Sequence, residues 1–365
     1  MTIYIILMAL IFIYGIYPYA KNNSKQSKKI FLFLAFFSMT IVLGLRGSSV
    51  GEDTGHYLNI FRNADDVKWS DMLQSSGMRT AYFTDQYGYT DTIENGFLAI
   101  CKVIHWFTNN GQILLFIIAA MTCWLFAKFI FDNCEKVFFP TYIFLCESMF
   151  MLAFNGARQI LAGAIAIQAY TLLKQGKWKK AIMVVLIASL IHNTALICFI
   201  IFPIMLIRPQ KESRTFKYAI IATVAAPFII VIAKNLIIRL FPRYTSYFYV
   251  NYWDNELGGI AILWVIELVL VLILYGKRFR ENESFKLSSL TLMYLACEFA
   301  GLQITMFSRV GWFFRPYLLL FFPESDKYFS KKSQAIINGV LMLLLALLYF
   351  SYARSSTRFY SFYWK

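Results

Sequence analysis

Long apolar blocks, most of them near the ~20 residues that cross a bilayer, constrain this chain more than any other feature. They alternate with short basic linkers such as KNNSKQSKK (21–29) and KQGKWKK (174–180). Hydrophobic residues make up 59% of the chain and charged residues only 15%, whereas a soluble domain carries about 25% charged residues. The short alternating segments of a transmembrane β-barrel are absent from the sequence. The pattern therefore predicts an all-α polytopic membrane protein.

The apolar runs predict roughly 10–12 transmembrane helices in one membrane domain, 1–365, with an external loop at 46–110 that carries interfacial helices. The segment 95–110 is too short and too polar to span, so we expect an interfacial or re-entrant helix there. The block 181–207 begins and ends at basic loops, and we expect two short or tilted helices that meet near His192. The candidate spans are 2–19, 30–45, 111–131, 137–154, 158–174, 181–207, 217–240, 258–275, 287–306, 310–323 and 334–352.

The net charge of +15 lies largely in the short linkers, which the positive-inside rule assigns to the cytoplasm. Attraction to anionic membrane lipid explains such charge, so we expect no nucleic-acid partner. With the first linker inside, the second span leaves the membrane at Arg46 and the segment 46–94 is external. The six cysteines form no CxxC pair, which argues against a zinc site or a disulfide framework.

Four arginines are exceptions to the charge rule, because they fall at the external ends of spans. The planar guanidinium presents donors that match phosphate oxygens in pairs. Several of them at one external cavity would bind a pyrophosphate group beside the lipid headgroups. The alternative is that each pairs with a nearby acid, as Arg309 would with Glu298, or extends to headgroups. The four are Arg46, Arg158, Arg309 and Arg315.

The stretch LRGSSVGEDTGHYLNIF (45–61) places acids and glycines directly outside the membrane. Asp53 could accept a proton from a sugar hydroxyl, or it could cap the helix that carries Tyr57. We include Tyr57 among the candidate substrate-binding residues. His192 is ionisable at membrane depth, which favours a functional role; a hydrogen-bonded structural histidine is the alternative.

Five stretches, in this order, resemble the EpsG-like exopolysaccharide polymerases, which are akin to the Wzy-type O-antigen polymerases. The resemblance covers about residues 40 to 325. On this resemblance Arg46 and Asp53 match an Arg-Gly-Asp-Thr-type motif, and Arg158 and Gln159 match an Asn-x-x-Arg-Gln motif. His192 and Arg309 match a helix histidine and a late arginine. The stretches are LRGSSVGEDTGHYLNIF, ENGF, NGARQILAGAIAIQAY, LIASLIHNTALI and FSRVGWFF.

The resemblance implies a multi-pass enzyme of the bacterial inner membrane with Wzy-like or GT-C-like architecture. It would transfer a growing glycan from undecaprenyl pyrophosphate to a sugar hydroxyl of another lipid-linked repeat unit, on the periplasmic side. Neither a metal nor a cofactor is implied, and a chain-length regulator and a flippase are expected partners. The proton acceptor stays open between Asp53 and His192.

Two other functions remain as alternatives. A flippase or other transporter of lipid-linked oligosaccharides should distribute polar residues through the bilayer depth and usually shows two related halves. Here the distinctive residues gather at one face, and we find no internal repeat, which favours chemistry over transport. An O-antigen ligase-type glycosyltransferase is the alternative within enzymes.

Overall fold

The computed structural model describes residues 1–75, 79–84, 90–207, 214–240, 257–277, 279, 281–354 and 359–364. Contacts within the chain define two compact units, where we predicted a single domain. Unit 1 combines Met1–Cys198 with Tyr349–Lys365, and unit 2 is Phe199–Leu348.

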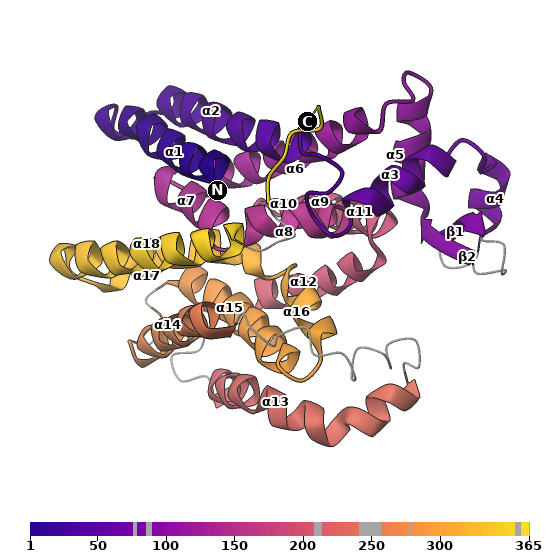
Figure 1. Ribbon diagram of the computed structural model, residues 1–365. Coiled ribbons are helices and arrows are strands. Elements are labelled where there is room, and N and C mark those ends of the chain that lie inside the picture. Colours follow the sequence, from indigo (N-terminus) through magenta and orange to yellow (C-terminus); the bar gives the residue numbers. More distant parts are fainter. Residues whose placement is uncertain are drawn as a thin grey trace. The chain divides into compact units, whose positions relative to one another are not determined.

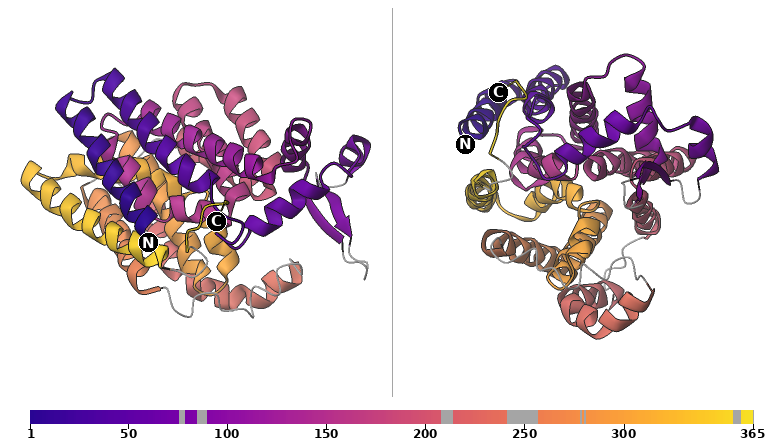
Figure 2. Two further views of the ribbon diagram at one scale, coloured as in Figure 1. Left: turned by 45° about the horizontal axis from the view of Figure 1, so that its top comes forward. Right: turned by 45° about the vertical axis from the view of Figure 1, so that its right-hand side comes forward.

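Unit 1 is a helical assembly built around α2 and α6, which pack against each other. The helix α1 adds to α2, and α9 packs on both α6 and α11. Figure 2 shows α1 and α2 side by side in both views. Apolar side chains such as Phe31, Phe126 and Leu161 fill the interior. The helices are α1 (Thr2–Ala20), α2 (Lys25–Gly44), α6 (Gly111–Asn133), α7 (Phe138–Cys146), α8 (Met149–Asn155), α9 (Ala157–Ala166), α10 (Gln168–Lys174) and α11 (Trp178–Ile191).

One of the predicted spans is clearly interrupted in unit 1. The span predicted over 137–154 divides into α7 and α8, which meet at a bend of 41°. Ser148 at this bend has φ 64°, a left-handed conformation that interrupts a right-handed helix. The span predicted over 158–174 comprises α9 and α10, and Ile167 between them keeps helical angles and donates to the Gly163 carbonyl oxygen at 2.9 Å.

The predicted bend near His192 is confirmed. The helix α11 ends at Ile191, and His192 follows in an extended conformation with φ −153°. A 3₁₀ helix, η2 (Asn193–Ile200), and the short α12 (Ile201–Leu206) continue the chain.

The segment between α2 and α6, which we predicted to be an external loop, contains three short helices and a hairpin among its described residues (Figure 1). The interfacial helix predicted near 95–110 is α5, whose 11 residues are too few to span a bilayer. The antiparallel pair β1–β2 departs from the expected all-α structure. Its register sets Arg79 opposite Glu94. The elements are α3 (Thr54–Asn63), α4 (Trp69–Gln74), β1 (Arg79–Thr84), β2 (Thr90–Glu94) and α5 (Asn95–His105).

Lys102 fixes α5 against the end of α3. Its side chain is buried, and Nζ donates to the carbonyl oxygens of Ala64 at 3.1 Å and Val67 at 2.6 Å. A cation at a helix C-terminus satisfies carbonyls that have no partner within the helix. Lys102 therefore ties α5 to the residues that follow α3.

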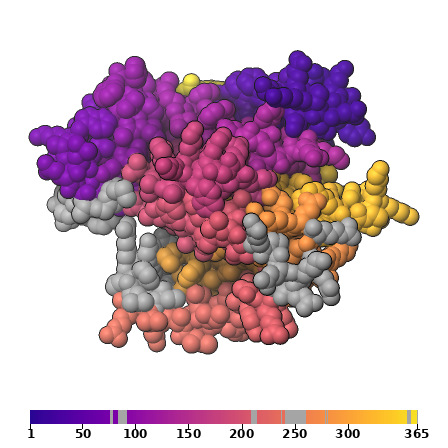
Figure 3. Space-filling model, turned by 180° about the vertical axis from the view of Figure 1, so that it is seen from behind, coloured from indigo at the N-terminus to yellow at the C-terminus, as the bar shows by residue number. Residues whose placement is uncertain are grey.

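Unit 2 is centred on α15, which packs against α13, α14, α16 and α17. One side of α13 is largely open: Tyr218 is 65% exposed and Ile232 85%, and Figure 3 shows its salmon-coloured surface. Such apolar exposure fits a lipid-facing helix. The elements are α13 (Arg214–Leu240), α14 (Leu257–Gly276), α15 (Asn282–Gly301), α16 (Thr305–Gly311), η4 (Arg315–Tyr317), α17 (Leu318–Ser325), η5 (Asp326–Tyr328) and α18 (Lys331–Ala353), whose last turn belongs to unit 1.

The fold confirms an all-α polytopic membrane protein. Within the described ranges, five helices are long and apolar enough to cross a membrane, or six if the bent pair α7–α8 counts as one span. These are fewer continuous spans than the roughly 10–12 that we expected from ~20-residue apolar runs. Part of the difference arises where an apolar run folds into shorter helices, as at Ser148 and His192, and in the region predicted as the span 310–323, where α16, η4 and α17 are short.

Candidate functional site

The loop after α2 is pressed against the end of α8 in unit 1. Gly51 has φ +88°, and a Cβ there would lie 2.3 Å from the carbonyl oxygen of Phe154. Only glycine permits both this conformation and this approach. The backbone N–H of Glu52 also donates to Asn155 Oδ1 at 3.2 Å. The glycine in GEDTGHY thus brings the segment around Asp53 next to the start of α9.

Glu94 lies where β2 passes into α5, and two arginines and a histidine converge on its carboxylate. Oε1 lies 3.0 Å from Arg79 Nη1 and 3.3 Å from His192 Nδ1, and Oε2 lies 2.6 Å from Arg158 Nη1. Glu94 itself is 1% exposed. We call these four residues the Glu94 cluster. Charge-assisted bonds of this kind are the strongest hydrogen bonds that side chains make.

The cluster keeps Glu94 ionised. Burial alone would raise the pKa of its carboxyl, but the hydrogen bond from His192 and the charges of Arg158, His192 and Arg79 outweigh it. The net effect lowers the pKa of Glu94 to about 2. Two guanidiniums face one carboxylate, so these three side chains carry a net positive charge, which favours a further anion nearby.

Arg158 reaches the cluster from the first turn of α9. Its guanidinium carbon lies 5.8 Å from the ring centre of Tyr57 and 5.6 Å from that of Phe97, distances at which rings attract a cation. Nε is buried and has no hydrogen-bond partner among the described residues. The side chain is nevertheless 17% exposed. Arg158 is therefore held in place by Glu94 and two rings while part of its donor edge is accessible.

His192 reaches the cluster because α11 ends directly beside α5. A Cβ at Gly96 would lie 2.6 Å from the carbonyl oxygen of Leu190, so the ENGF stretch needs a glycine for this contact. The imidazole presents Nδ1 to Glu94 and is 23% exposed.

Tyr57 and Asp53 form the flank of the site on α3. Tyr57 is 2% exposed, and its hydroxyl lies 3.0 Å from the Asn155 carbonyl oxygen and 3.4 Å from Asp53 Oδ2. Burial raises the pKa of Tyr57 to about 12, despite the opposing charge of Arg158. Asp53 stands at the N-cap position of α3 without a side-chain capping bond. Thr54 is bonded elsewhere, to the Val50 carbonyl oxygen.

Arg46 lies inside unit 1. It is 1% exposed, Nη1 donates to the Leu43 carbonyl oxygen at 2.7 Å, and Nε donates to Thr54 Oγ1 at 3.0 Å. Burial lowers the pKa of Arg46 to about 10, so it remains a cation at neutral pH. Its backbone forms an isolated bridge to Phe362. Arg46 thus joins the loop to the C-terminal segment.

The other candidate residues lie beside this site or in unit 2. Gln159 follows Arg158 and is buried at 6% exposure. Arg309 is exposed on α16. Arg315, 3% exposed, pairs through Nη2 with Glu298 Oε1 at 2.9 Å. The ion pair that we considered for Glu298 and Arg309 is thus formed with Arg315 among the described contacts.

The sequence analysis did not select two members of the cluster, Glu94 and Arg79. Glu94 was one of many external acids, although the ENGF stretch that contains it was noted. The partners of Glu94 lie 15, 64 and 98 positions away along the chain, so no local sequence pattern predicts these contacts. A usable signal was Gly96, two residues after Glu94, because a glycine at a helix start can indicate close contact with another segment, here the end of α11.

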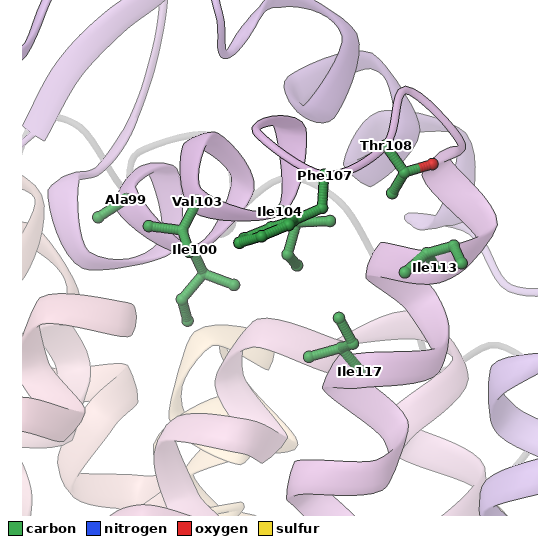
Figure 4. A pocket seen from close by; sticks show the side chains of 8 residues that line it. All are labelled: Ala99, Ile100, Val103, Ile104, Phe107, Thr108, Ile113 and Ile117. Atoms are coloured by element: carbon green, nitrogen blue, oxygen red, sulfur yellow. The ribbon is translucent and has the colours of Figure 1, made fainter.

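An apolar groove of about 570 Å³ borders α5 in unit 1. Figure 4 shows side chains of α5 and α6 facing each other across it. The helix α5 therefore begins at the Glu94 cluster and then forms one wall of this apolar groove. No group of three or more His, Cys, Asp or Glu side chains is arranged for a metal ion within the described ranges. The groove is lined by Ala99, Ile100, Val103, Ile104, Phe107, Thr108, Ile113 and Ile117.

Comparison with known proteins identifies the family. A model of the EpsG family matches residues 29–365, which is most of the chain. No curated protein and no solved structure matches it. The resemblance read from the five sequence stretches is thereby confirmed. The chain belongs to the EpsG family, which implies an exopolysaccharide polymerase-type role, that of a glycosyltransferase-like membrane protein.

Proposed function

We propose that this protein polymerises lipid-linked repeat units on the outer face of the bacterial inner membrane. The growing glycan would move from undecaprenyl pyrophosphate to a sugar hydroxyl of a second lipid-linked unit. The observation that carries this proposal is the Glu94 cluster, in which Arg79, Arg158 and His192 meet beside Tyr57 and Asp53. This arrangement offers an anion site and a proton acceptor in one place.

In the transfer, the bond between the anomeric carbon and the pyrophosphate oxygen breaks, and the pyrophosphate leaves with the electron pair. The acceptor hydroxyl oxygen bonds to that carbon and loses its proton to a base. Arg158 and Arg79 would stabilise the negative charge that develops on the leaving oxygen. Both are already held by Glu94, so little reorganisation is needed when that charge forms.

The groove between α5 and α6 is consistent with a donor substrate that carries a lipid chain. A polyprenyl pyrophosphate has an anionic end and a long apolar chain. In unit 1 the cationic cluster lies at the start of α5, and the apolar groove follows along the same helix. We place the isoprenoid chain in this groove, where burial of hydrocarbon adds binding energy.

The directions of α2 and α11 support a site on the outer side. Each helix starts at a basic loop, Lys21–Lys29 for α2 and Lys174–Lys180 for α11, and ends near the site. The positive-inside rule assigns both loops to the cytoplasm. The opposite ends then carry Gly51 and His192 toward the periplasmic side.

Purified protein in liposomes with one synthetic lipid-linked repeat unit tests the proposal. The wild type should produce a ladder of polymers. We expect Arg158→Ala to lower kcat by about 10²–10³-fold, as does loss of a donor to a developing negative charge. Arg62→Ala is the matched control, because Arg62 is an exposed arginine of the neighbouring α3, and it should retain the ladder.

Three outcomes would contradict the proposal. The first is transport of the lipid-linked unit across the bilayer without any ladder, which would indicate a flippase. The second is a folded Arg158→Ala variant that polymerises at the wild-type rate, which would remove Arg158 from the site. Transfer of a single glycan to a non-repeat acceptor, again without a ladder, would instead indicate a ligase.

A further inference from the structure

Glu94 and His192 form a pair whose geometry goes beyond an anion site. Glu94 Oε1 lies 3.3 Å from Nδ1 of the imidazole. The two ring nitrogens lie on opposite edges of an imidazole, so a carboxylate at Nδ1 turns Nε2 away from itself. The ring is 23% exposed, whereas the Glu94 side chain is 2% exposed. The carboxylate is therefore behind the histidine, and the histidine is the group that a substrate can reach.

The surrounding charges act on this pair through Glu94. The helix α11 packs against α5 and α9. From α9, Arg158 binds the second oxygen of Glu94, and from β1, Arg79 shares the first. The two guanidiniums repel a positive charge that forms on the imidazole during the transfer, and the carboxylate attracts it. Among the described contacts, Glu94 is therefore the neighbour that would stabilise such a charge.

We infer that Glu94 is the positioning residue that makes His192, not Asp53, the proton acceptor of the transfer. This inference rests on the proposed function. Glu94 Oε1 faces Nδ1 at 3.3 Å and would direct the ring proton to that nitrogen, so that Nε2 takes the proton of the acceptor hydroxyl as its oxygen bonds to the anomeric carbon. The electron pair of the broken bond leaves with the pyrophosphate. The imidazolium is stabilised by Glu94 and returns its proton to water.

The other two carboxylates fit this task less well. Glu94 is itself a weak base, since its pKa of about 2 is far below the working pH that suits a general base. It is also too buried to touch a sugar. Asp53 is near Tyr57 Oη at 3.4 Å. The Tyr57 hydroxyl donates to Asp53 Oδ2, so one of the two Asp53 carboxylate oxygens already has a partner.

The test is the pH dependence of kcat for ladder formation in liposomes. We expect His192→Gln to lower kcat by about 10²–10⁴-fold, the usual contribution of a general base. Glu94→Gln should lower kcat and also move the acid limb of the profile to lower pH, because the imidazolium loses its counterion. Glu94→Asp should keep the acid limb near its wild-type position. Asp53→Asn should leave the limb unchanged.

A second measurement does not depend on whether Glu94 variants fold. The chain has only three histidines, so ¹⁵N-histidine NMR of the wild-type protein can follow each one, with His192→Gln to assign the signal. We expect His192 to carry its proton on Nδ1 when neutral. His105→Gln is the matched control, because His105 stacks on Phe61 at the far end of α5, and it should keep the wild-type pH profile.

The results separate this inference from the function on which it rests. If the wild type forms no ladder, the proposed polymerase function fails. If the wild type forms a ladder but neutral His192 is protonated on Nε2, or Asp53→Asn removes the acid limb while folded His192→Gln keeps it, the assignment of the base is wrong and the polymerase function stands.

Discussion

At the scale of single residues, the clearest feature of the molecule is a buried carboxylate surrounded by cations. Removing one partner of such a group leaves an uncompensated charge, which is far costlier than the pair is stabilising. Glu94 therefore has two roles. It positions Arg158 and His192, and it contributes to the free energy of unfolding of unit 1.

Because Glu94 contributes to stability in its ionised form, the stability of the folded protein should depend on pH. The pKa of Glu94 is lowered to about 2 from the ordinary glutamate value of 4.5, so its contribution to stability is fully present above pH 4.5 and is lost as the pH falls toward 2. The shift corresponds to on the order of 3 kcal/mol. Thermal unfolding of wild type and Glu94→Gln, from pH 7 to pH 3, measures it. The gap between the two melting temperatures should narrow from pH 4.5 down to pH 3, as Glu94 begins to lose its contribution; a constant gap would contradict the prediction.

Single residues show which features of the site could be predicted from the sequence and which could not. Arg158 and His192 could be selected because an arginine at an external span end and an ionisable group at membrane depth each break a rule. Arg46 breaks the same rule, yet its guanidinium is buried on Leu43 and Thr54. We assign it a folding role. Exposure and partner choice distinguish these arginines, and both arise from tertiary contacts that a local pattern does not contain.

At the scale of helices and strands, apolar periodicity located most segments but not their breaks. The spans at 2–19, 30–45 and 111–131 correspond to α1, α2 and α6. The break at His192 was predictable because 27 residues cannot cross twice between two basic loops. The break at Ser148 has no such signal. The β1–β2 hairpin was missed because its alternation is short and lies in a polar loop.

The helix α5 contributes to both parts of the proposed donor site, the Glu94 cluster at its start and the apolar groove along its length. The binding of a donor should therefore depend on the length of its polyprenyl chain. Val103 is 41% exposed and lines the groove, so Val103→Trp should fill part of it. We expect KM to rise about tenfold for a long polyprenyl donor, the equivalent of about two buried CH₂ groups. KM for a short-chain donor, and kcat for both, should change little.

Met121→Trp is the control for this experiment. Met121 is 37% exposed on α6 but does not line the groove, so it should leave both donors unaffected. An equal rise in KM for long and short donors would show that the groove does not bind the hydrocarbon chain.

At the scale of the whole molecule, the site is useful only if it faces the compartment where lipid-linked units are joined. Hydropathy alone cannot orient a polytopic chain; the distribution of Lys and Arg does. The two helices that end at the Glu94 cluster or beside it, α11 and α2, both begin at lysine-rich loops. Their agreement predicts one orientation, with the loop after α2 outside and the loop before α11 inside.

Single introduced cysteines test that orientation in intact cells with a membrane-impermeant maleimide. Ser49 lies exposed in the loop after α2, and Gln175 is exposed in the loop before α11. Of the native cysteines, five are buried and Cys297 is intermediate, so background labelling should be low. Ser49→Cys should react in intact cells after the outer layers are removed, and Gln175→Cys should react only after the membrane is permeabilised. The reverse pattern would place the Glu94 cluster on the cytoplasmic side, where polymerisation of exported repeat units could not occur, and it would refute the proposed function at its root.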